Sequence, residues 1–392
     1  MYGRKEGVIH ERVKKRKLNF SPIHLRSAEL MLIRIPLLNP FETSFGRTSV
    51  KEAVIVRLDS GDSQAYGECT AEREPYYSYE FNSMSWKVIS DLILPMLAGA
   101  EISSPLDFGT LTHRVRGHSM SKGAVEMALW DLFCRSAGMP LHRAIGGVRK
   151  RIECGISIGI QDSVDTLIST IARSLDQGYR RIKIKVKPGW DTEVLERVRT
   201  EFPDIPLQVD ANAAYSLHSI RTLKDMDRFN LTMIEQPLDY DDLLEHSILQ
   251  RRIRTPICLD ESIKGDESVK LMHRLGSGRV VNIKAGRVGG IAGSLSVHDT
   301  AMERNIPVWI GGMLETGIGR SFNVALNTLP DVRFPGDTSP SSRYFRRDII
   351  VEPFEMDSKG RMPVPSKNGS GIEVDERELE RWTAKRKILK LS

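Results

Sequence analysis

Charged residues recur at a nearly constant interval through the second half of the chain. They are separated by 25, 25, 25 and 24 residues, and in order they are Lys185, Asp210, Glu235, Asp260 and Lys284. About 25 residues is the length that one strand, a crossover helix and two short loops require. We therefore expect each charge at the same height on successive strands of a parallel barrel, where three carboxylates and two lysines face a common axis.

Short apolar runs rich in β-branched residues surround these charges, and amphipathic segments of helical length follow them. Eight strands are predicted, at residues 153–160, 180–187, 206–212, 231–237, 256–262, 280–286, 307–313 and 331–337. Strands that alternate with helices indicate βα units and a parallel sheet. The predicted fold class is therefore α/β, with a (β/α)8-type barrel that carries the catalytic site over residues 151–337.

The flanking sequence predicts a second domain that covers the mouth of the barrel. Residues 23–150 combine predicted strands with predicted helices, which is typical of an α+β capping domain. Residues 338–392 are expected to return to this cap, and residues 1–22 form a separate basic extension. Two cap loops, 39–48 and 68–77, are the expected lids over the site.

Aromatic residues in the two lids are candidates to line a dry pocket between cap and barrel. They are Phe41, Phe45, Tyr76 and Tyr77. Aromatic side chains also fill ordinary cores, so both interpretations stay open at this stage. The helical segment at residues 123–138 is apolar on nearly every side, which predicts that it is buried.

Two lysines lie two positions apart in the predicted strand at 180–187. Because side chains at i and i+2 share a face, Lys183 and Lys185 point the same way. An exposed edge strand is the ordinary interpretation of such an alternation. In a parallel sheet buried on both faces, however, inward lysines need counter-charges, and the acidic strand ends that follow supply them. We therefore predict catalytic roles for Lys183, Lys185 and Lys284, the last of which faces the opposite side of a substrate carbon.

Three carboxylates are predicted to hold a divalent cation. Asp210, Glu235 and Asp260 taken singly could be turn or cap residues. Together they offer hard oxygen ligands without histidine or cysteine, which favours magnesium, or manganese in its place. Such a cation would hold a substrate carboxylate while an amine removes the adjacent carbon-bound proton. Asn212 and Gln236 are candidates to support these ligands.

Net charge is concentrated at the N-terminus. The chain carries +6, and residues 1–20 contribute seven basic and two acidic side chains, or +5 of that total. A basic arm of this kind could bind nucleic acid or a membrane surface, but it lacks interleaved aromatic residues. We interpret it as a solvated, disordered arm or a misassigned start, and we expect neither nucleic acid nor membrane as a partner.

The rest of the composition is that of an ordinary globular enzyme. No apolar run approaches about 18 residues, so neither a membrane span nor a secretory signal is expected. The four cysteines, Cys69, Cys134, Cys154 and Cys258, form no close pairs. That spacing fits a reducing compartment, and we expect a cytoplasmic protein.

These residues together resemble the enolase superfamily, in its muconate-lactonising subgroup, over residues 23–383. The K-x-K motif ends at Lys185, and the second catalytic lysine is Lys284 in NIKAGRVGG. The metal ligands are Asp210 in DANAAYS, Glu235 in IEQPL and Asp260 in LDES. The segment GGMLETGIGR is similar to the version found in o-succinylbenzoate synthases and N-succinylamino acid racemases.

The resemblance implies a magnesium-dependent lyase, specifically a hydro-lyase of menaquinone synthesis. Such an enzyme dehydrates 2-succinyl-6-hydroxy-2,4-cyclohexadiene-1-carboxylate to o-succinylbenzoate through an ene-diolate. An N-succinylamino acid racemase, or a related epimerase or cycloisomerase, is the alternative with the same two lysines. A non-catalytic binding protein on an enzyme scaffold is a remote third.

Substrate contacts are also carried over from the resemblance. It implies a small-molecule carboxylate as substrate and a homo-oligomeric assembly. The contacts are expected at Ser157, Asn212, Gly311 and Gly312, with the two glycine amides receiving a succinyl carboxylate. Glycines at such positions can instead serve only to permit a tight turn.

Overall fold

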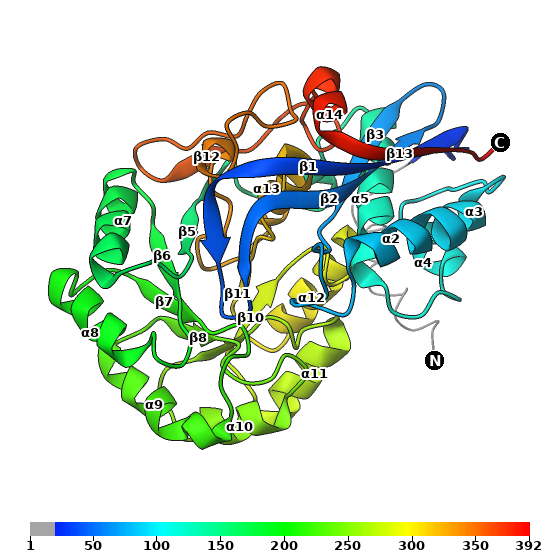
Figure 1. Ribbon diagram of the computed structural model, residues 1–392. Helices are drawn as coiled ribbons and strands as arrows, with labels where there is room; N and C mark the ends of the chain where they lie inside the picture. The colour runs from blue at the N-terminus through cyan, green and yellow to red at the C-terminus, as the bar shows by residue number, and fades with distance from the viewer. Residues whose placement is uncertain (1–19) are drawn as a thin grey trace.

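The computed structural model describes residues 20–392, which form a curved parallel sheet and a separate antiparallel sheet with helices around them (Figure 1). Residues 1–19 of the predicted basic extension, and its interpretation as a solvated arm, lie outside the described residues. The ring of Phe20 packs edge-on against Trp130 and Phe133, at centroid distances of 6.4 and 5.3 Å. The packed chain therefore already includes Phe20, slightly before the start at residue 23 that the resemblance indicated.

Seven parallel strands form the larger sheet, in the order β11-β10-β9-β8-β7-β6-β5. The strands are β5 (Gly155–Ile158), β6 (Arg181–Lys185), β7 (Leu207–Asp210), β8 (Met233–Glu235), β9 (Ile257–Leu259), β10 (Val280–Ile283) and β11 (Val308–Ile310). Each lies within one of the predicted runs and is shorter than that run. The prediction of a parallel βα sheet is confirmed.

Helices follow these strands in the chain and lie around the outside of the sheet (Figure 1). They are α7 (Val164–Asp176), α8 (Thr192–Glu201), α9 (Ile220–Asp225), α10 (Leu244–Gln250), α11 (Asp266–Leu275), α12 (Ile291–Met302) and α13 (Gly317–Leu326). Short 3-10 turns flank α9, at η3 (Leu217–Ser219) and η4 (Met226–Phe229). Buried apolar side chains of these helices join those of the strands in one continuous core.

The eighth strand expected at residues 331–337 does not form as a strand. Val332 makes an isolated parallel bridge to β11, and Gly336 makes another to the residue just before β5. The segment thus reaches both edges of the seven-stranded sheet without a continuous ladder. Asp331 has a positive φ of 58°, and Pro335 has no amide hydrogen to donate, so regular pairing is interrupted.

Strand register brings the periodic charges to one height. Lys185 pairs with Asp210 across β6 and β7, and Asp210 pairs with Glu235 across β7 and β8. Asp260 and Lys284 directly follow the last residues of β9 and β10. The charges therefore gather at the carboxyl ends of five neighbouring strands, which is where parallel barrels carry their active sites.

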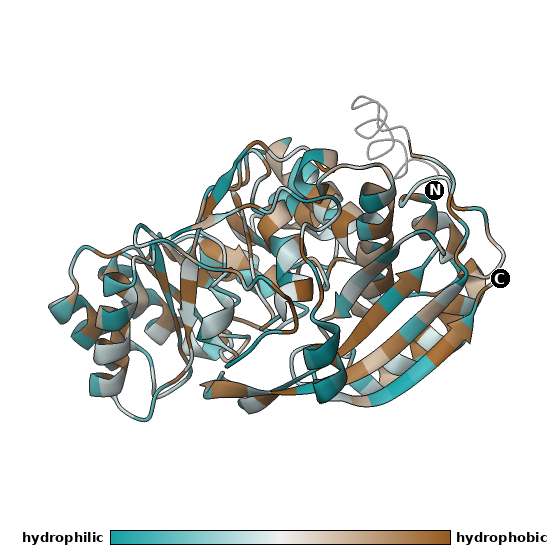
Figure 2. Ribbon diagram, turned by 90° about the horizontal axis from the view of Figure 1, so that it is seen from above, coloured by the Kyte–Doolittle hydropathy of each residue, from teal (hydrophilic) through white to brown (hydrophobic). Residues whose placement is uncertain are grey.

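The cap is built on a four-stranded antiparallel sheet of order β13-β1-β2-β3. Its strands are β1 (Ser27–Glu42), β2 (Arg47–Asp59), β3 (Gln64–Cys69) and β13 (Thr383–Lys390), so a strand near the C-terminus pairs with β1. Figure 2 shows apolar residues along these strands, and Ala53 to Val56 of β2 are all buried, so both faces of the sheet are covered at its centre. Because β1 and β2 continue to Glu42 and from Arg47, the expected lid at 39–48 is largely a hairpin.

Helices of the cap follow β3 in the chain. They are α2 (Asn82–Val88), the π-helical turn η2 (Ile89–Ile93), α3 (Leu94–Leu97), α4 (Asp107–Leu111), α5 (Ser119–Ser136) and α6 (Leu141–Ala144). Helices α2 and α5 pack against one face of the sheet. The remaining elements are β4 (Arg151–Glu153), which pairs with β12 (Arg361–Pro363), the turn η5 (Ser341–Arg343) and α14 (Glu376–Trp382). Among residues 20–392, no helix is long and apolar enough to cross a bilayer.

Helix α5 is the buried element that joins cap and barrel. Its residues from Gly123 to Cys134 are all buried, as the apolar composition predicted. A Cβ atom added to Gly67 of β3 would lie 1.9 Å from the carbonyl oxygen of Ala124, so strand and helix touch backbone to backbone. On its other side, a Cβ atom at Gly123 would lie 3.1 Å from the amide nitrogen of Gly290 in the barrel.

Candidate active site

Lys185 ends strand β6, and its buried ammonium group is held by two barrel residues. Its Nζ atom donates to Asp210 Oδ2 at 2.7 Å and to Asn212 Oδ1 at 2.6 Å. Asn212 in turn donates from Nδ2 to Glu261 Oε1 at 3.0 Å. The chain of contacts fixes the position of the lysine at the mouth of the sheet.

Lys183, two positions earlier on the same face, is more completely neutralised. Its Nζ atom lies 3.2 Å from Asp210, 2.9 Å from Glu235 and 2.8 Å from Asp337. It also lies 4.7 Å from the ring centroid of Trp309. Although burial opposes the charge, the three carboxylates raise the pKa of Lys183 above its ordinary value. Lys183 therefore stays an ammonium group near neutral pH.

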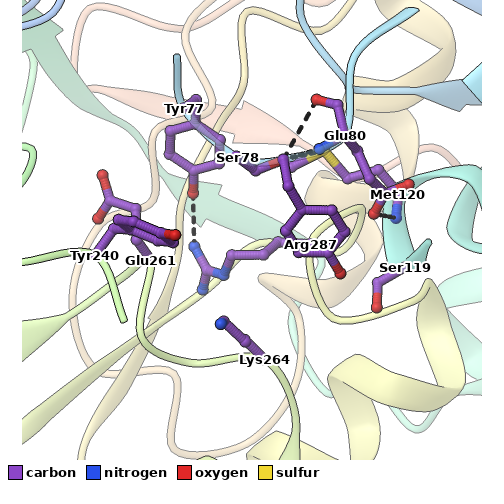
Figure 3. A pocket seen from close by; sticks show the side chains of 10 residues that line it. Tyr77, Ser78, Glu80, Ser119, Met120, Tyr240, Glu261, Lys264 and Arg287 are labelled. Atoms are coloured by element: carbon purple, nitrogen blue, oxygen red, sulfur yellow. Dashed lines mark hydrogen bonds between the residues drawn. The ribbon is translucent and has the colours of Figure 1, made fainter. Parts of the chain in front are cut away.

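Lys284 is held by a residue of the cap as well as by the barrel. Its Nζ atom donates to Asp260 Oδ2 at 2.8 Å and to the Tyr77 hydroxyl at 3.2 Å, and it lies 4.5 Å from the Tyr77 ring centroid. Arg287 donates to the same hydroxyl at 2.9 Å (Figure 3). Its guanidinium group also pairs with Asp260. Burial disfavours the charged form of Lys284, but the Asp260 carboxylate raises the pKa of Lys284 well above its ordinary value.

The three predicted metal ligands converge in the same buried region. Glu235 Oε2 accepts hydrogen bonds from Lys183 at 2.9 Å and Gln208 at 2.7 Å, and Oε1 accepts from Asn282 at 2.8 Å. Burial, together with the charge of Asp210, raises the pKa of Glu235 to about 7. Asp210 and Asp260 are buried too, but the cations beside them lower the pKa of each carboxyl below its ordinary value.

Charged nitrogen atoms occupy the space between these carboxylates in the described structure. Within residues 20–392, no three acidic, histidine or cysteine side chains are arranged as a ready-made metal cluster. Asp210 and Asp260 instead face ammonium and guanidinium groups. The donor set still suits a hard divalent cation, because it consists of buried carboxylate oxygens whose mutual repulsion such a cation would relieve.

A cavity joins the lysines to the cap. It is lined by Lys185 and Lys284 on the barrel side and by Phe41, Phe45 and Tyr77 on the cap side. These three aromatic residues therefore lie where the lid interpretation placed them. Tyr76 does not join them: it is 65% exposed and lines an outer hollow instead.

The predicted substrate contacts differ in whether their polar groups are free to bind a ligand in the cavity. Ser157 lines the cavity, and its buried hydroxyl has no hydrogen-bond partner among the described residues. Asn212 and Gly312 line it too. The expectation for Gly311 is wrong, because its amide donates to the carbonyl of Ile283 at 3.0 Å and is not free to bind a carboxylate.

A second, smaller cavity lies behind Tyr77. It is lined by Tyr77, Glu261 and Arg287 together with Glu80 and other residues of the cap and barrel (Figure 3). Tyr77 lines both cavities, so its ring is the wall between them. Glu261 Oε2 has no hydrogen-bond partner among the described residues, and burial with the nearby Asp260 charge raises the pKa of Glu261 to about 8.

Three residues of the site were missed from the sequence. Asp337 ends the predicted segment 331–337, so an acidic residue at a strand end was the available signal. Arg287 lies in the turn after Lys284 and carries no periodic signal, because its contact depends on how that turn folds. Glu261 directly follows the predicted ligand Asp260, so its carboxylate adds no separate spacing signal to the sequence.

Comparison with known proteins assigns this site to an enzyme class. The description "Enolase C-terminal domain-like" matches residues 166–378, and "Mandelate racemase / muconate lactonizing enzyme, N-terminal domain" matches residues 27–146. The chain therefore belongs to the mandelate racemase and muconate lactonizing enzyme group of the enolase superfamily, and the resemblance seen in the sequence is confirmed.

Individual relatives with named activities resemble this chain over most of its length. An o-succinylbenzoate synthase of Geobacillus kaustophilus is 44% identical over 362 residues, which cover 92% of this chain and 96% of the relative. An N-succinylamino acid racemase of Thermus thermophilus is also 44% identical, over 92% of this chain and 98% of the relative. A crystal structure of an enolase superfamily member from Listeria innocua superposes with a TM-score of 0.90 at 38% identity, covering 94% of this chain and all of that one.

Proposed function

We propose that this chain is an o-succinylbenzoate synthase. It would remove water from 2-succinyl-6-hydroxy-2,4-cyclohexadiene-1-carboxylate. The observation that carries the proposal is the pair of lysines, Lys185 and Lys284, which line one cavity from strand ends separated by β7, β8 and β9. Full-length relatives with this name, such as that of Bacillus subtilis at 36% identity over 93% of this chain, support it.

Lys185 is the residue that moves the proton. As a neutral amine it would take the proton from the carbon next to the substrate carboxylate, and the electron pair of that bond would form a new carbon–carbon double bond. The carbon–oxygen bond to the hydroxyl would then break, and Lys185 would return the proton so that water leaves. Asp210 and Asn212 hold the ammonium form between these steps.

Lys284 acts from the other face of the substrate. Held as an ammonium group by Asp260, it places a positive charge beside the planar intermediate, where negative charge develops. The Tyr77 ring and hydroxyl keep it oriented. Lys183 lines the same cavity, and its predicted role in catalysis would be to balance the charges of Asp210, Glu235 and Asp337, which lie around its ammonium group.

Asp210, Glu235 and Asp260 would hold Mg²⁺, with Mn²⁺ as a substitute. When bound, the cation supplies positive charge to the substrate carboxylate and so acidifies the neighbouring carbon. The amide of Gly312 and the hydroxyl of Ser157 would bind the polar groups of the succinyl chain, since both line the cavity. Four unpaired, buried cysteines support a reducing cytoplasm as the location. Menaquinone synthesis as the pathway and a homo-oligomeric assembly stay predictions.

A second candidate function is racemisation of N-succinylamino acids. It is favoured by the same opposed lysines, one of which would remove the α-proton while the other delivers a proton to the opposite face. The relative from Thermus thermophilus is as similar to this chain as the synthases from Geobacillus. Both reactions begin with the same proton removal, so one site can support both.

The proposed function is tested by dehydration with purified protein and Mg²⁺. Lys185→Ala should lower kcat by at least about 10³-fold, because the base is lost. Lys187→Ala is the matched control: this lysine lies on the same face but its Nζ atom sits 3.4 Å from Glu42, and its side chain is 38% exposed. Full turnover by the Lys185 variant, or in exhaustive chelator, would contradict the proposal.

A further inference from the structure

A carboxylate of the cap docks on a barrel helix that follows the second lysine. Glu126 of α5 is fully buried, and its Oε2 atom accepts from the amide of Ile291 at 2.7 Å. Its Oε1 atom accepts from the amide of Ala292 at 2.8 Å and from Trp130 Nε1 at 2.7 Å. Ile291 begins α12, whose first amides have no partner within the helix, and the preceding Gly290 has no side chain to cap them.

The turn between Lys284 and α12 leaves little room for movement. The amide of Val288 donates to the carbonyl of Lys284 at 3.1 Å, and that of Gly290 donates to the carbonyl of Ala285 at 2.7 Å. Gly290 has a φ of 100°, and a Cβ atom there would lie 2.0 Å from Glu126 Oε2. The lysine, the turn and the cap carboxylate are thus linked by short contacts with no intervening space for another side chain.

Helix α5 reinforces this link with its own backbone. A Cβ atom at Gly123 would lie 3.1 Å from the amide nitrogen of Gly290 and 3.3 Å from the carbonyl oxygen of Gly286. The helix therefore touches both ends of the turn, one helical turn before Glu126. Contacts to Lys185, in contrast, come from the barrel residues Asp210 and Asn212, and helix α5 makes no hydrogen bond to either of them in the described part of the chain. Ser44 of the cap hairpin donates only to the backbone carbonyl of Asn212, at 3.2 Å.

We propose that Glu126 is a positioning residue for Lys284, through which helix α5 of the cap sets the position of this lysine and not that of Lys185. The inference rests on the proposed function only in that Lys284 must reach the substrate carbon. A purely structural role would make Glu126 stabilise α12 and affect both lysines equally, through the fraction of folded enzyme.

The two roles are separated by hydrogen–deuterium exchange at the α-carbon of each enantiomer of an N-succinylamino acid, followed by NMR in D₂O. Lys185→Ala and Lys284→Ala first identify which enantiomer each lysine deprotonates. Glu126→Ala should then lower the Lys284-dependent rate at least about 10-fold relative to the Lys185-dependent rate. Glu126→Gln, which keeps one acceptor, should show a smaller change in the same ratio.

Because both rates are measured on aliquots of one enzyme preparation, a loss of folded protein lowers them equally and does not alter their ratio. Asp131→Asn is the matched control: this residue lies on the same helix, is buried, and accepts from the amide of Ser370 at 2.6 Å, away from the Lys284 turn. It should leave the ratio unchanged. Equal changes of both rates in the Glu126 variants, or no change in either rate, would overturn the inference.

Failure of the proposed function would give a different result. A wild type that exchanges both enantiomers but forms no o-succinylbenzoate would contradict the synthase proposal, while the exchange ratio would still decide the role of Glu126.

Discussion

The ammonium group of Lys183 differs from that of Lys185 in how completely it is neutralised. Three carboxylates lie within 3.2 Å of Lys183, whereas Lys185 contacts Asp210 and the neutral amide of Asn212. A lysine held by three carboxylates cannot release its proton near neutral pH. At the scale of single residues, this supports the proposal that Lys185 is the base and that Lys183 balances the buried acids.

Replacing Glu235 by glutamine should weaken metal binding without unfolding the protein. Glutamine keeps the shape and removes one of three converging negative charges, so the Kd for Mn²⁺ should rise at least about 10-fold. Titration followed by the electron paramagnetic resonance of free Mn²⁺ measures this. Glu68→Gln, which removes a buried carboxylate elsewhere, should leave the Kd unchanged. Equal affinity of the wild type and the Glu235 variant would rule out the proposed ligand set.

Residue types with a fixed spacing could be predicted from the sequence, whereas contacts made by turns could not. Lys183, Lys185 and Asp210 follow from alternation within a strand and from the period between strands. Arg287 was missed because the way the turn after Lys284 folds brings it back to Asp260, and no spacing in the sequence reveals that contact. Gly311 was assigned wrongly because its amide continues the sheet toward Ile283, which its sequence motif does not reveal.

At the scale of elements, buried glutamates of the cap occupy the starts of three helices. Glu80 accepts from the amides of Met120 and Ser121 at the start of α5, and Glu68 accepts from those of Thr316 and Gly319 at the start of α13. Glu126 does the same for α12. Each carboxylate satisfies helix amides that lack partners, and two of the three tie the cap to the barrel.

The stability of the protein should depend on pH through Glu126. Burial raises the pKa of this carboxyl to about 7, although its hydrogen bonds to Ala292, Ile291 and Trp130 oppose the shift. A raised pKa means that the folded state binds the proton more tightly. The stabilisation is therefore complete below pH 4.5, the ordinary value, and is lost as the pH rises through 7.

Urea unfolding of the wild type and of Glu126→Gln between pH 4.5 and 8 tests this dependence of stability on pH. Relative to the variant, the free energy of unfolding of the wild type should fall by up to about 3 kcal/mol as the pH rises. Two profiles that run parallel over this range would show that the carboxyl titrates at its ordinary pKa.

Most strands and helices could be predicted because their apolar periods are clear, but element ends depend on tertiary contacts. The segment at 331–337 has the composition of a strand. Within this described segment, however, only Val332 forms a bridge to β11, and only Gly336 forms a bridge to the residue before β5. The expected lid at 39–48 became part of the β1 and β2 hairpin, since those strands extend beyond their apolar cores. In both cases, the ends of the element depend on pairing with residues that are far away in the sequence.

At the scale of the whole molecule, neither domain makes the site alone. The barrel supplies Lys185 and Lys284, while the cap supplies Phe41 and Tyr77 to the same cavity and Glu126 to the turn behind it. Strand β13 near the C-terminus then completes the cap sheet beside β1. The division into cap and barrel could be predicted from the order of strands and helices, but not the contacts of α5 with the Lys284 turn, because they depend on backbone approach at Gly123.

The central claim is that dehydration, rather than racemisation, is the main reaction of this site. The most direct measurement is kcat/KM of the purified enzyme with Mg²⁺ for o-succinylbenzoate formation and for racemisation of a panel of N-succinylamino acids. Dehydration should exceed the best racemisation at least about 10-fold, which corresponds to about 1.4 kcal/mol of transition-state preference. Rapid racemisation together with negligible dehydration would contradict the account and assign the chain to the racemases.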